Sequence, residues 1–241
     1  MKPIFNYILT ASLSLLLSLN VYSQSFGISA GMNISELNFN DSDNSSSFYG
    51  DFKSILGVNA GFHYDFKFSE RAGMRLGLAY SSKGFAYDSE ISFTSTIGGD
   101  IFSEYSRLES NARLNYIQLN PMFKYTIPVG EKNAFYFLVG PYIGVGVFGK
   151  LDQSQTYSYT DPTGTMNVNE SNSEDIEFGQ DGDGFDYLDF GVTPSIGFQL
   201  HSFFVEASYD IGINDIDTYN EDDFKAYNRT LSIKLGYLFE K

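Results

Sequence analysis

The C-terminal segment 230–239 alternates strictly between apolar residues and polar or small residues. Its apolar side chains are Leu231, Ile233, Leu235, Tyr237 and Phe239, and the intervening ones are Ser232, Lys234 and Gly236. Side chains alternate between the two faces of a β-strand, so the pattern predicts a strand with one apolar face. The aromatic residue near its end is typical of the closing strand of an outer-membrane β-barrel.

The same alternation recurs in seven earlier segments. These span residues 26–34, 56–66, 74–81, 117–125, 135–147, 188–199 and 205–212. Each apolar face is about as long as the 9–11 residues that a tilted strand needs to cross a bilayer. The chain therefore contains eight predicted strands of membrane-spanning length.

The connections between these segments alternate in length. Short turns are predicted near 69–71, 130–133 and 201–202, and long connections rich in Ser, Asn, Asp and Gly are predicted over 35–53, 87–112, 149–184 and 214–226. Short turns at one end and long loops at the other are typical of outer-membrane barrels. We expect an all-β fold: an eight-stranded antiparallel up-and-down transmembrane β-barrel with short periplasmic turns and long extracellular loops.

Glycine indicates which face points inward. A soluble lipocalin-like barrel would show the same period with the apolar face inside, and this is the alternative. Here glycines crowd the polar face, for example Gly27, Gly31, Gly57, Gly140 and Gly144. A narrow lumen needs small residues, whereas a solvated outer face does not. The apolar face is therefore expected to contact lipid, which places the protein in the cell outer membrane.

The N-terminal 23 residues have the features of a secretory signal peptide. Lys2 precedes an apolar stretch from Ile8 to Leu19, and small or medium residues precede Gln24. We expect cleavage of residues 1–23 and a barrel domain over 24–241; a retained N-terminal anchor is the alternative. The absence of cysteine excludes a lipoprotein anchor, disulfides and thiolate metal sites.

The chain is strongly acidic, with 15 basic and 30 acidic residues. This charge disfavours nucleic acid and anionic lipid head groups as ligands. The acidic residues concentrate in the long connections, which we interpret as a solvated surface. Within one of them, Asp181, Asp183 and Asp186 form a hypothetical calcium site, because clustered carboxylates on a glycine-bent loop suit calcium. Phe185 stands where an EF-hand loop needs an oxygen ligand, and no other cofactor is expected.

Charged residues also fall on the inward face of the predicted strands. The expected lumen network comprises Asp65, Arg75, Lys83, Lys124, Glu206, Asp210 and Lys234. Eight strands enclose only enough room for their own side chains, and buried charges must pair. We favour a salt-bridged plug that fixes strand register; a gated ion path or a binding site is the alternative.

The chain offers no visible catalytic constellation. Of its two histidines, His63 is expected to face the lumen and His201 to lie in a periplasmic turn. Neither lies beside an outward-facing serine at membrane depth, where a lipid-processing barrel would need a Ser/His pair. We therefore expect a protein that is not an enzyme.

Several stretches of the mature chain resemble the PorT-like outer-membrane β-barrel family of Bacteroidetes. They occur in family order at 27–35, 80–84, 116–121, 140–144 and 209–216. The resemblance implies an integral outer-membrane protein, mostly of unassigned function, and the family's namesake takes part in protein secretion. Two departures are Glu240 and Lys241 after the terminal aromatic residue and a long acidic third loop.

Three functions fit these features. The favoured one is a non-enzymatic structural or interaction protein with a packed polar lumen, which contacts a protein partner through its acidic extracellular loops. The second is a narrow porin-like channel for small solutes or ions, lined by Arg75, Lys124, Glu206 and Lys234. The third is an accessory component of an outer-membrane secretion system that contacts the secretion machinery.

Overall fold

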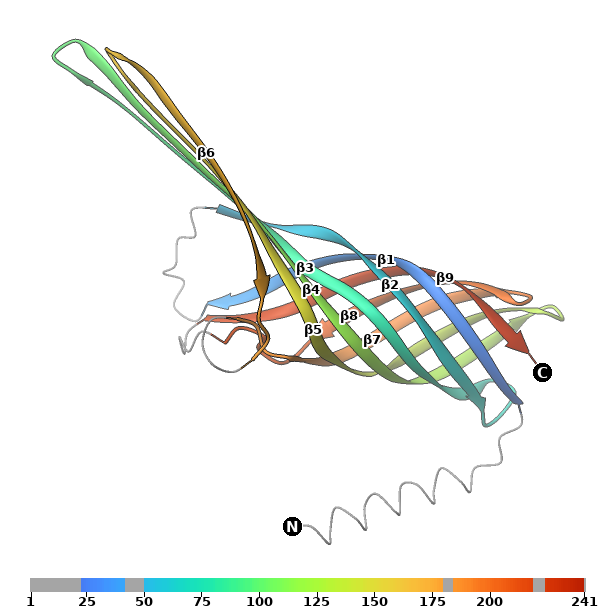
Figure 1. Ribbon diagram of the computed structural model, residues 1–241. Coiled ribbons are helices and arrows are strands. Elements are labelled where there is room, and N and C mark those ends of the chain that lie inside the picture. Colours follow the sequence, from blue (N-terminus) through green and yellow to red (C-terminus); the bar gives the residue numbers. More distant parts are fainter. Residues whose placement is uncertain (1–22, 42–49, 180–183, 219–223, 241) are drawn as a thin grey trace, which may run out of the picture.

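A closed antiparallel barrel of eight strands forms the body of the molecule (Figure 1). The computed structural model describes residues 23–41, 50–179, 184–218 and 224–240. The barrel strands are β1 (Ser23–Asp41), β2 (Gly50–Lys67), β3 (Ala72–Ile97), β4 (Asp100–Val129), β5 (Asn133–Asp161), β7 (Leu188–Leu200), β8 (Phe203–Gly212) and β9 (Phe224–Glu240). Each pairs with the next in this order, and β9 closes the ring on β1. The predicted fold class is confirmed.

The alternation of the sequence becomes the two faces of the barrel wall. Outward apolar side chains stay exposed, such as Leu56 at 60% and Leu235 at 67%, whereas the inward residues Arg75 and Asp189 are buried at 4% and 0%. An exposed apolar belt over a polar interior is the reverse of a soluble barrel and fits a lipid-facing wall. The prediction that the apolar face points outward is confirmed. Among the described residues, no helix is long and apolar enough to cross a membrane.

Glycine makes room in the lumen for large aromatic rings from neighbouring strands. A Cβ on Gly197 would lie 2.1 Å from the ring of Tyr136, and one on Gly236 would lie 2.2 Å from the ring of Phe204. A small side chain on one strand thus faces a large one on the next. This pairing fills a barrel of eight strands without leaving a pore.

The short turns, the start of β1 and the end of β9 all lie at one end of the barrel. The turns between β2 and β3, β4 and β5, and β7 and β8 occupy residues 68–71, 130–132 and 201–202. Strand β1 begins and β9 finishes at this same end (Figure 1). It is the periplasmic end, as predicted. The predicted signal peptide lies outside the described residues except for Ser23.

At the extracellular end, two of the predicted long loops are strands, and this part of the prediction is wrong. Residues 87–112 continue β3 and β4 as a paired hairpin to Ile97 and Asp100, and much of 149–184 forms the end of β5 and the ninth strand, β6 (Gly164–Ile176). Gly98 and Gly99, with φ of 67° and 98°, make the two-residue turn. The Ser- and Thr-rich composition resembled a loop, but Thr and Tyr favour strands.

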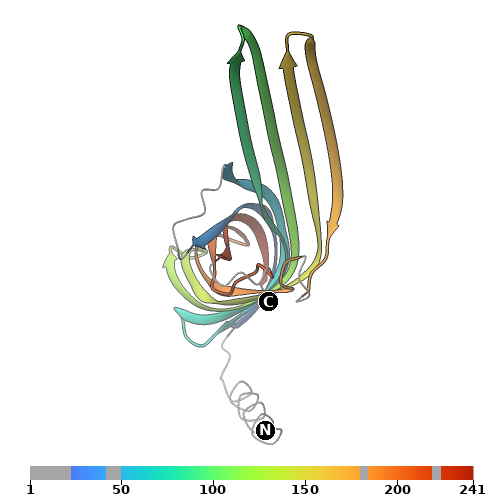
Figure 2. The same ribbon diagram turned by 90° about the vertical axis from the view of Figure 1, so that its left-hand side faces the viewer.

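These strands form a four-stranded sheet that we call the extension. It comprises residues 87–97 of β3, 100–110 of β4, 153–161 of β5 and 164–172 of β6, paired in the order β3-β4-β5-β6. With about 3.3 Å per residue, it reaches roughly 35 Å beyond the barrel. Figures 1 and 2 show that it leans away from the barrel axis to one side.

Beneath the extension, an apolar cluster caps the extracellular mouth of the barrel. Leu37, Leu114, Tyr116, Ile216 and Ala226 are buried together, and Phe85, Ile176, Phe178 and Phe185 pack against them. Two isolated bridges, Phe178 to Phe185 and Phe185 to Asp217, tie the segments after β6 and β8 across the opening. The lumen is thus closed at this end by side chains from β1, β4 and β9 and from the described loops.

Candidate functional site

The periplasmic half of the lumen holds one network of paired charges. Arg75 donates two hydrogen bonds to Asp65, at 2.7 and 2.9 Å, and a third to Glu206 at 2.7 Å. Lys124 Nζ lies 2.5 Å from the Asp65 carboxylate, and Lys234 Nζ lies 3.1 Å from Glu206. Bidentate arginine–carboxylate pairs fix geometry as well as charge. Strands β2, β3, β4, β8 and β9 are therefore connected through the barrel interior.

Aromatic rings complete this network. The Arg75 guanidinium lies over the rings of Tyr136 and Phe204, at 5.3 and 5.5 Å, and Lys124 Nζ lies 4.7 Å from the Tyr136 ring centre. The Tyr136 hydroxyl donates to Glu206 at 3.1 Å. Cations over ring faces gain further attraction where water is excluded.

The extracellular half holds a second network around Lys83, which is fully buried. Lys83 Nζ lies 2.9 Å from Asp189 and 3.0 Å from Asp210. The Tyr142 hydroxyl donates to Asp189 at 2.9 Å, and the Thr193 hydroxyl donates to Asp210 at 2.7 Å. Every carboxylate here has both a cation and a neutral donor, as buried charges require.

Taken together, the two networks are electrically balanced. Their four cations are Arg75, Lys83, Lys124 and Lys234, and their four carboxylates are Asp65, Asp189, Glu206 and Asp210. The cavity between them has a volume of about 50 Å³. That space holds a few water molecules but no continuous aqueous channel.

The structure places all seven sequence-predicted lumen residues inside the barrel, divided between the two networks. Asp189 is the member that the sequence analysis missed, although it lies on the polar side of its alternating segment. The signal was present, because Asp189 has the same parity as the other inward residues of β7.

His63 also lies in the lumen, as predicted, and its ring packs edge-on against Phe204 with ring centres 5.4 Å apart. Within the described residues, its Nε2 atom has no hydrogen-bond partner. It therefore packs as an aromatic side chain.

The calcium hypothesis receives no support from geometry. Asp181 and Asp183 lie outside the described residues. Asp186 is described, and its carboxylate accepts a hydrogen bond from the backbone N–H of Leu188 at 3.0 Å, as in an ordinary turn. Within the described part of the chain, no cluster of three or more His, Asp or Glu side chains could hold a metal ion.

The extension has two chemically distinct faces. We call one the apolar face; its large side chains are Ile91, Phe93, Ile97, Phe102, Leu108, Tyr157, Tyr159, Met166 and Val168. The other is the polar face, which apart from Ile101 and Tyr105 presents mostly Ser92, Thr94, Thr96, Ser103, Ser154, Thr156, Ser158, Thr160, Thr165, Asn167, Asn169 and Ser171. On the apolar face Phe93 is 63% and Met166 is 54% exposed. Exposed apolar side chains gathered on one face indicate a surface for contact.

Carboxylates lie both within this apolar face and at its edge. Glu104 lies across from Phe93 and Tyr159 in the strand register, and Glu170 lies near the edge on β6. Burial and the neighbouring Glu104 carboxylate raise the pKa of the Tyr157 hydroxyl. The one basic residue of the extension, Arg107, points to the polar face and pairs with Asp88. All charged side chains on the apolar face are therefore acidic.

A family comparison places the chain among outer-membrane barrels, and comparisons with solved structures give weak similarities. Residues 22–218 match the outer membrane protein beta-barrel domain family. The solved Ail protein of Yersinia pestis, its attachment invasion locus protein, shares 18% identity at a TM-score of 0.38, over 90% of this chain and 99% of that one. The NalP translocator domain of Neisseria meningitidis shares 12% at 0.26, over 99% and 96%.

An outer membrane channel from Pseudomonas putida F1 shares 10% identity at a TM-score of 0.29, over 90% of this chain and 96% of that one. No curated protein matches the chain. These similarities are too low to carry a ligand or an activity over to it. Because the family match spans most of the sequence and the structure is the expected barrel, the chain belongs to the outer membrane protein beta-barrel domain family and is a protein of the outer membrane.

Proposed function

We propose that this protein is a non-enzymatic interaction protein of the outer membrane, in which the barrel is the anchor and the extension is the working surface. The observation that carries the proposal is the exposed apolar face of the extension, which reaches about 35 Å beyond the barrel. A sheet face with Phe93, Ile97 and Met166 exposed to water is unfavourable in free energy unless another molecule covers it. The barrel supplies a fixed platform for that contact.

Charge indicates what kind of molecule would cover this face. Glu104 and Glu170 border the apolar side chains, and Arg107 points to the other face. A partner with apolar side chains and basic groups would match both features, because complementary charges steer association and exclude wrong partners. We therefore propose a protein or peptide segment of basic, amphipathic character.

The channel alternative has less support. The lumen is filled by two charge networks around a cavity of about 50 Å³, and an apolar cluster caps its mouth. The protein should show no ion conductance in planar bilayers at any salt concentration.

A role as a secretion accessory rests on the PorT-like resemblance alone, and co-purification with envelope partners would test it. Cleavage after residue 23 also stays a proposal, which N-terminal sequencing of the mature protein would check.

Site-specific photo-crosslinking on intact cells tests the interaction proposal. A photoreactive phenylalanine analogue is placed at Phe93 or Tyr159 on the apolar face, with Thr94 and Ser158 on the polar face as matched controls one position away. We expect defined protein adducts from the apolar-face positions and few from the controls. Equal labelling of the two faces, or no adducts from either, would overturn the proposal.

A further inference from the structure

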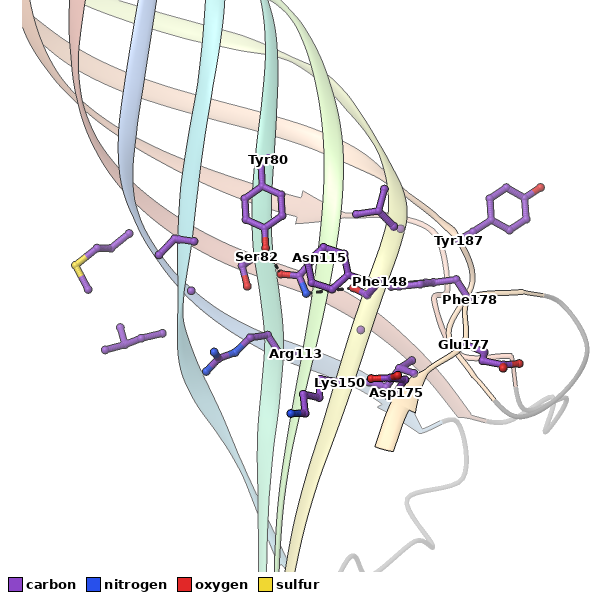
Figure 3. A pocket seen from close by; sticks show the side chains of 18 residues that line it. Tyr80, Ser82, Arg113, Asn115, Phe148, Lys150, Asp175, Glu177, Phe178 and Tyr187 are labelled. Carbon is purple, nitrogen blue, oxygen red and sulfur yellow. Dashed lines mark hydrogen bonds between the residues drawn. The ribbon is translucent and has the colours of Figure 1, made fainter. Parts of the chain in front are cut away.

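A groove lies on the outer wall where the extension bends away from the barrel (Figure 3). Its volume is about 980 Å³, and side chains from β1 to β5 and from the end of β6 line it. Most belong to the outward face, including Met32 of β1, Leu56 and Val58 of β2, and Arg113 of β4. The groove therefore opens on the side of the wall that contacts lipid, at the extracellular end of the apolar belt.

Two cations border this groove and are directly opposite each other in the sheet. Arg113 of β4 pairs in register with Lys150 of β5. Among the described residues Arg113 forms no ion pair, and Lys150 has only a distant contact to Asp152 at 3.9 Å. The nearby cations Lys53 and Arg107, by contrast, both bind Asp88. Arg113 and Lys150 are thus free to bind an external anion.

The groove also has a fixed apolar wall. Met32, Leu56 and Val58 are each more than half exposed and continue the lipid-facing belt. Beside them, the rings of Tyr80 and Phe148 stack with centres 6.4 Å apart. Asn115, which is buried, accepts a hydrogen bond from the Tyr80 hydroxyl at 2.6 Å and donates one to the Phe148 carbonyl at 3.1 Å. Locked side chains of this kind favour a preformed site.

We propose that this groove binds the head group of a phosphorylated lipid in the outer leaflet. Arg113 and Lys150 would hold the phosphate, since arginine matches phosphate geometry with two parallel hydrogen bonds. The first methylenes of the acyl chains would lie against Met32, Leu56 and Val58. An anion attached to an acyl chain is the ligand class that uses both parts of the groove.

The net charge of the chain predicts repulsion of such lipids, but the local arrangement outweighs it. At physiological ionic strength charges beyond about 8 Å are largely screened, so the two nearest cations dominate. Asp175 is the register neighbour of Lys150 on β6, and it lines the groove together with Glu177. Figure 3 shows both on the side away from the Arg113 guanidinium. The phosphate would therefore lie on the Arg113 side of the groove.

Lipid retention in nanodiscs tests this inference. The full mature protein is reconstituted in a phosphate-free galactolipid bilayer with lipid A that keeps or lacks its phosphates, and bound lipid is quantified by native mass spectrometry. We expect retention of the phosphorylated form and a loss of about tenfold or more for R113Q/K150Q, because two charge-assisted contacts disappear. The matched control K53Q/R107Q, in which the removed cations are already paired, should retain lipid as the wild type does.

Asp175→Asn gives the opposite sign, since removal of a nearby carboxylate should strengthen retention. Heat-modifiable migration verifies that each variant is folded. Equal retention by R113Q/K150Q, or equal binding of the phosphate-free lipid by the wild type, would overturn the inference. Competition by millimolar inorganic phosphate would instead indicate a site for the free anion and would also contradict it.

Discussion

The barrel and the extension share three strands and invert their polarity. Along β3, the inward positions are Arg75 and Lys83 within the barrel but Ile91 and Phe93 in the extension. Pairing with β4 runs from end to end without a register shift, so the parity of the faces never changes. The same face of one continuous strand is thus polar in the membrane-spanning barrel and apolar in the extension beyond the membrane.

Solvent explains the inversion. Inside the bilayer the outward face must be apolar, and the enclosed inward face can carry charges only if they pair. Beyond the bilayer both faces meet water, and no barrel wall lies opposite the inward one. Its exposed aromatic side chains therefore fill no lumen. This difference is the observation behind the proposal that the apolar side chains of the extension contact another molecule.

The largest expected effect is the loss of a buried charge partner in the barrel. Lys83→Met leaves Asp189 and Asp210 facing each other without their cation. We expect a loss of about 3–5 kcal/mol of unfolding free energy, measured by urea unfolding in lipid vesicles. Adding D189N and D210N to this variant should restore most of it, because no unpaired charge is left. If the single variant were as stable as the wild type, the balanced networks would have no structural role.

Overpacking of the lumen should have a smaller effect. A Cβ at Gly197 would lie 2.1 Å from the ring of Tyr136, whose hydroxyl donates a hydrogen bond to the Glu206 carboxylate. Gly197→Val should cost about 1–3 kcal/mol in the same urea experiment. Gly98→Ala is the matched change in the extension, where no atom lies within 4 Å of the added group and φ is 67°. It should leave the unfolding free energy of the barrel unchanged. A lower unfolding free energy would show that the barrel depends on the extension for its stability.

Sequence predicted the barrel better than the extension for a physical reason. Within the membrane, lipid imposes an apolar side chain at every second position, so segments such as 56–66 and 135–147 identify themselves. In the extension neither face must be uniformly apolar, and Ser, Thr and Asn alternate with aromatic residues. Composition then resembles a loop, although the period of two persists in Ile91, Phe93, Tyr157 and Tyr159.

The lumen network was largely predictable, because the alternation of side chains along a strand shows which charged residues point inward. The alternation does not show which charges pair with each other. Arg75 bridges Asp65 and Glu206 only because the closed barrel brings distant strands together. The groove at the bend was not predictable either. Arg113 and Lys150 lie 37 positions apart in sequence, and only the register of β4 and β5 places them side by side.

The ion pair at the base of the extension should contribute little to stability, and its contribution should depend on pH. Hydrogen bonds from Arg107 and then Lys53 lower the pKa of Asp88 to about 2, from an ordinary value of 3.8. A lowered pKa in the folded state stabilises above the ordinary value, and the contribution disappears as pH falls through about 2. The carboxyl carbon shift of Asp88 in an NMR titration should show that midpoint. A midpoint near 4 would mean that the pair does not persist in solution.

Removal of the extension should have the smallest effect on the barrel. Residues 91–106 and 155–170 are replaced by Asn-Gly turns, which join Glu90 to Arg107 and Ser154 to Ser171, residues that are register partners or next to them. None of the removed residues belongs to a lumen network or to the apolar cluster at the mouth. None belongs to the buried cluster of the periplasmic half either, which comprises Met122, Tyr136, Leu138, Phe204 and Leu238. Heat-modifiable migration and the urea midpoint should therefore match the wild type, whereas photo-crosslinking from this region is lost. A shortened protein that failed to form the barrel would show that the extension belongs to the folding unit, and its exposed apolar face would then need an explanation in folding.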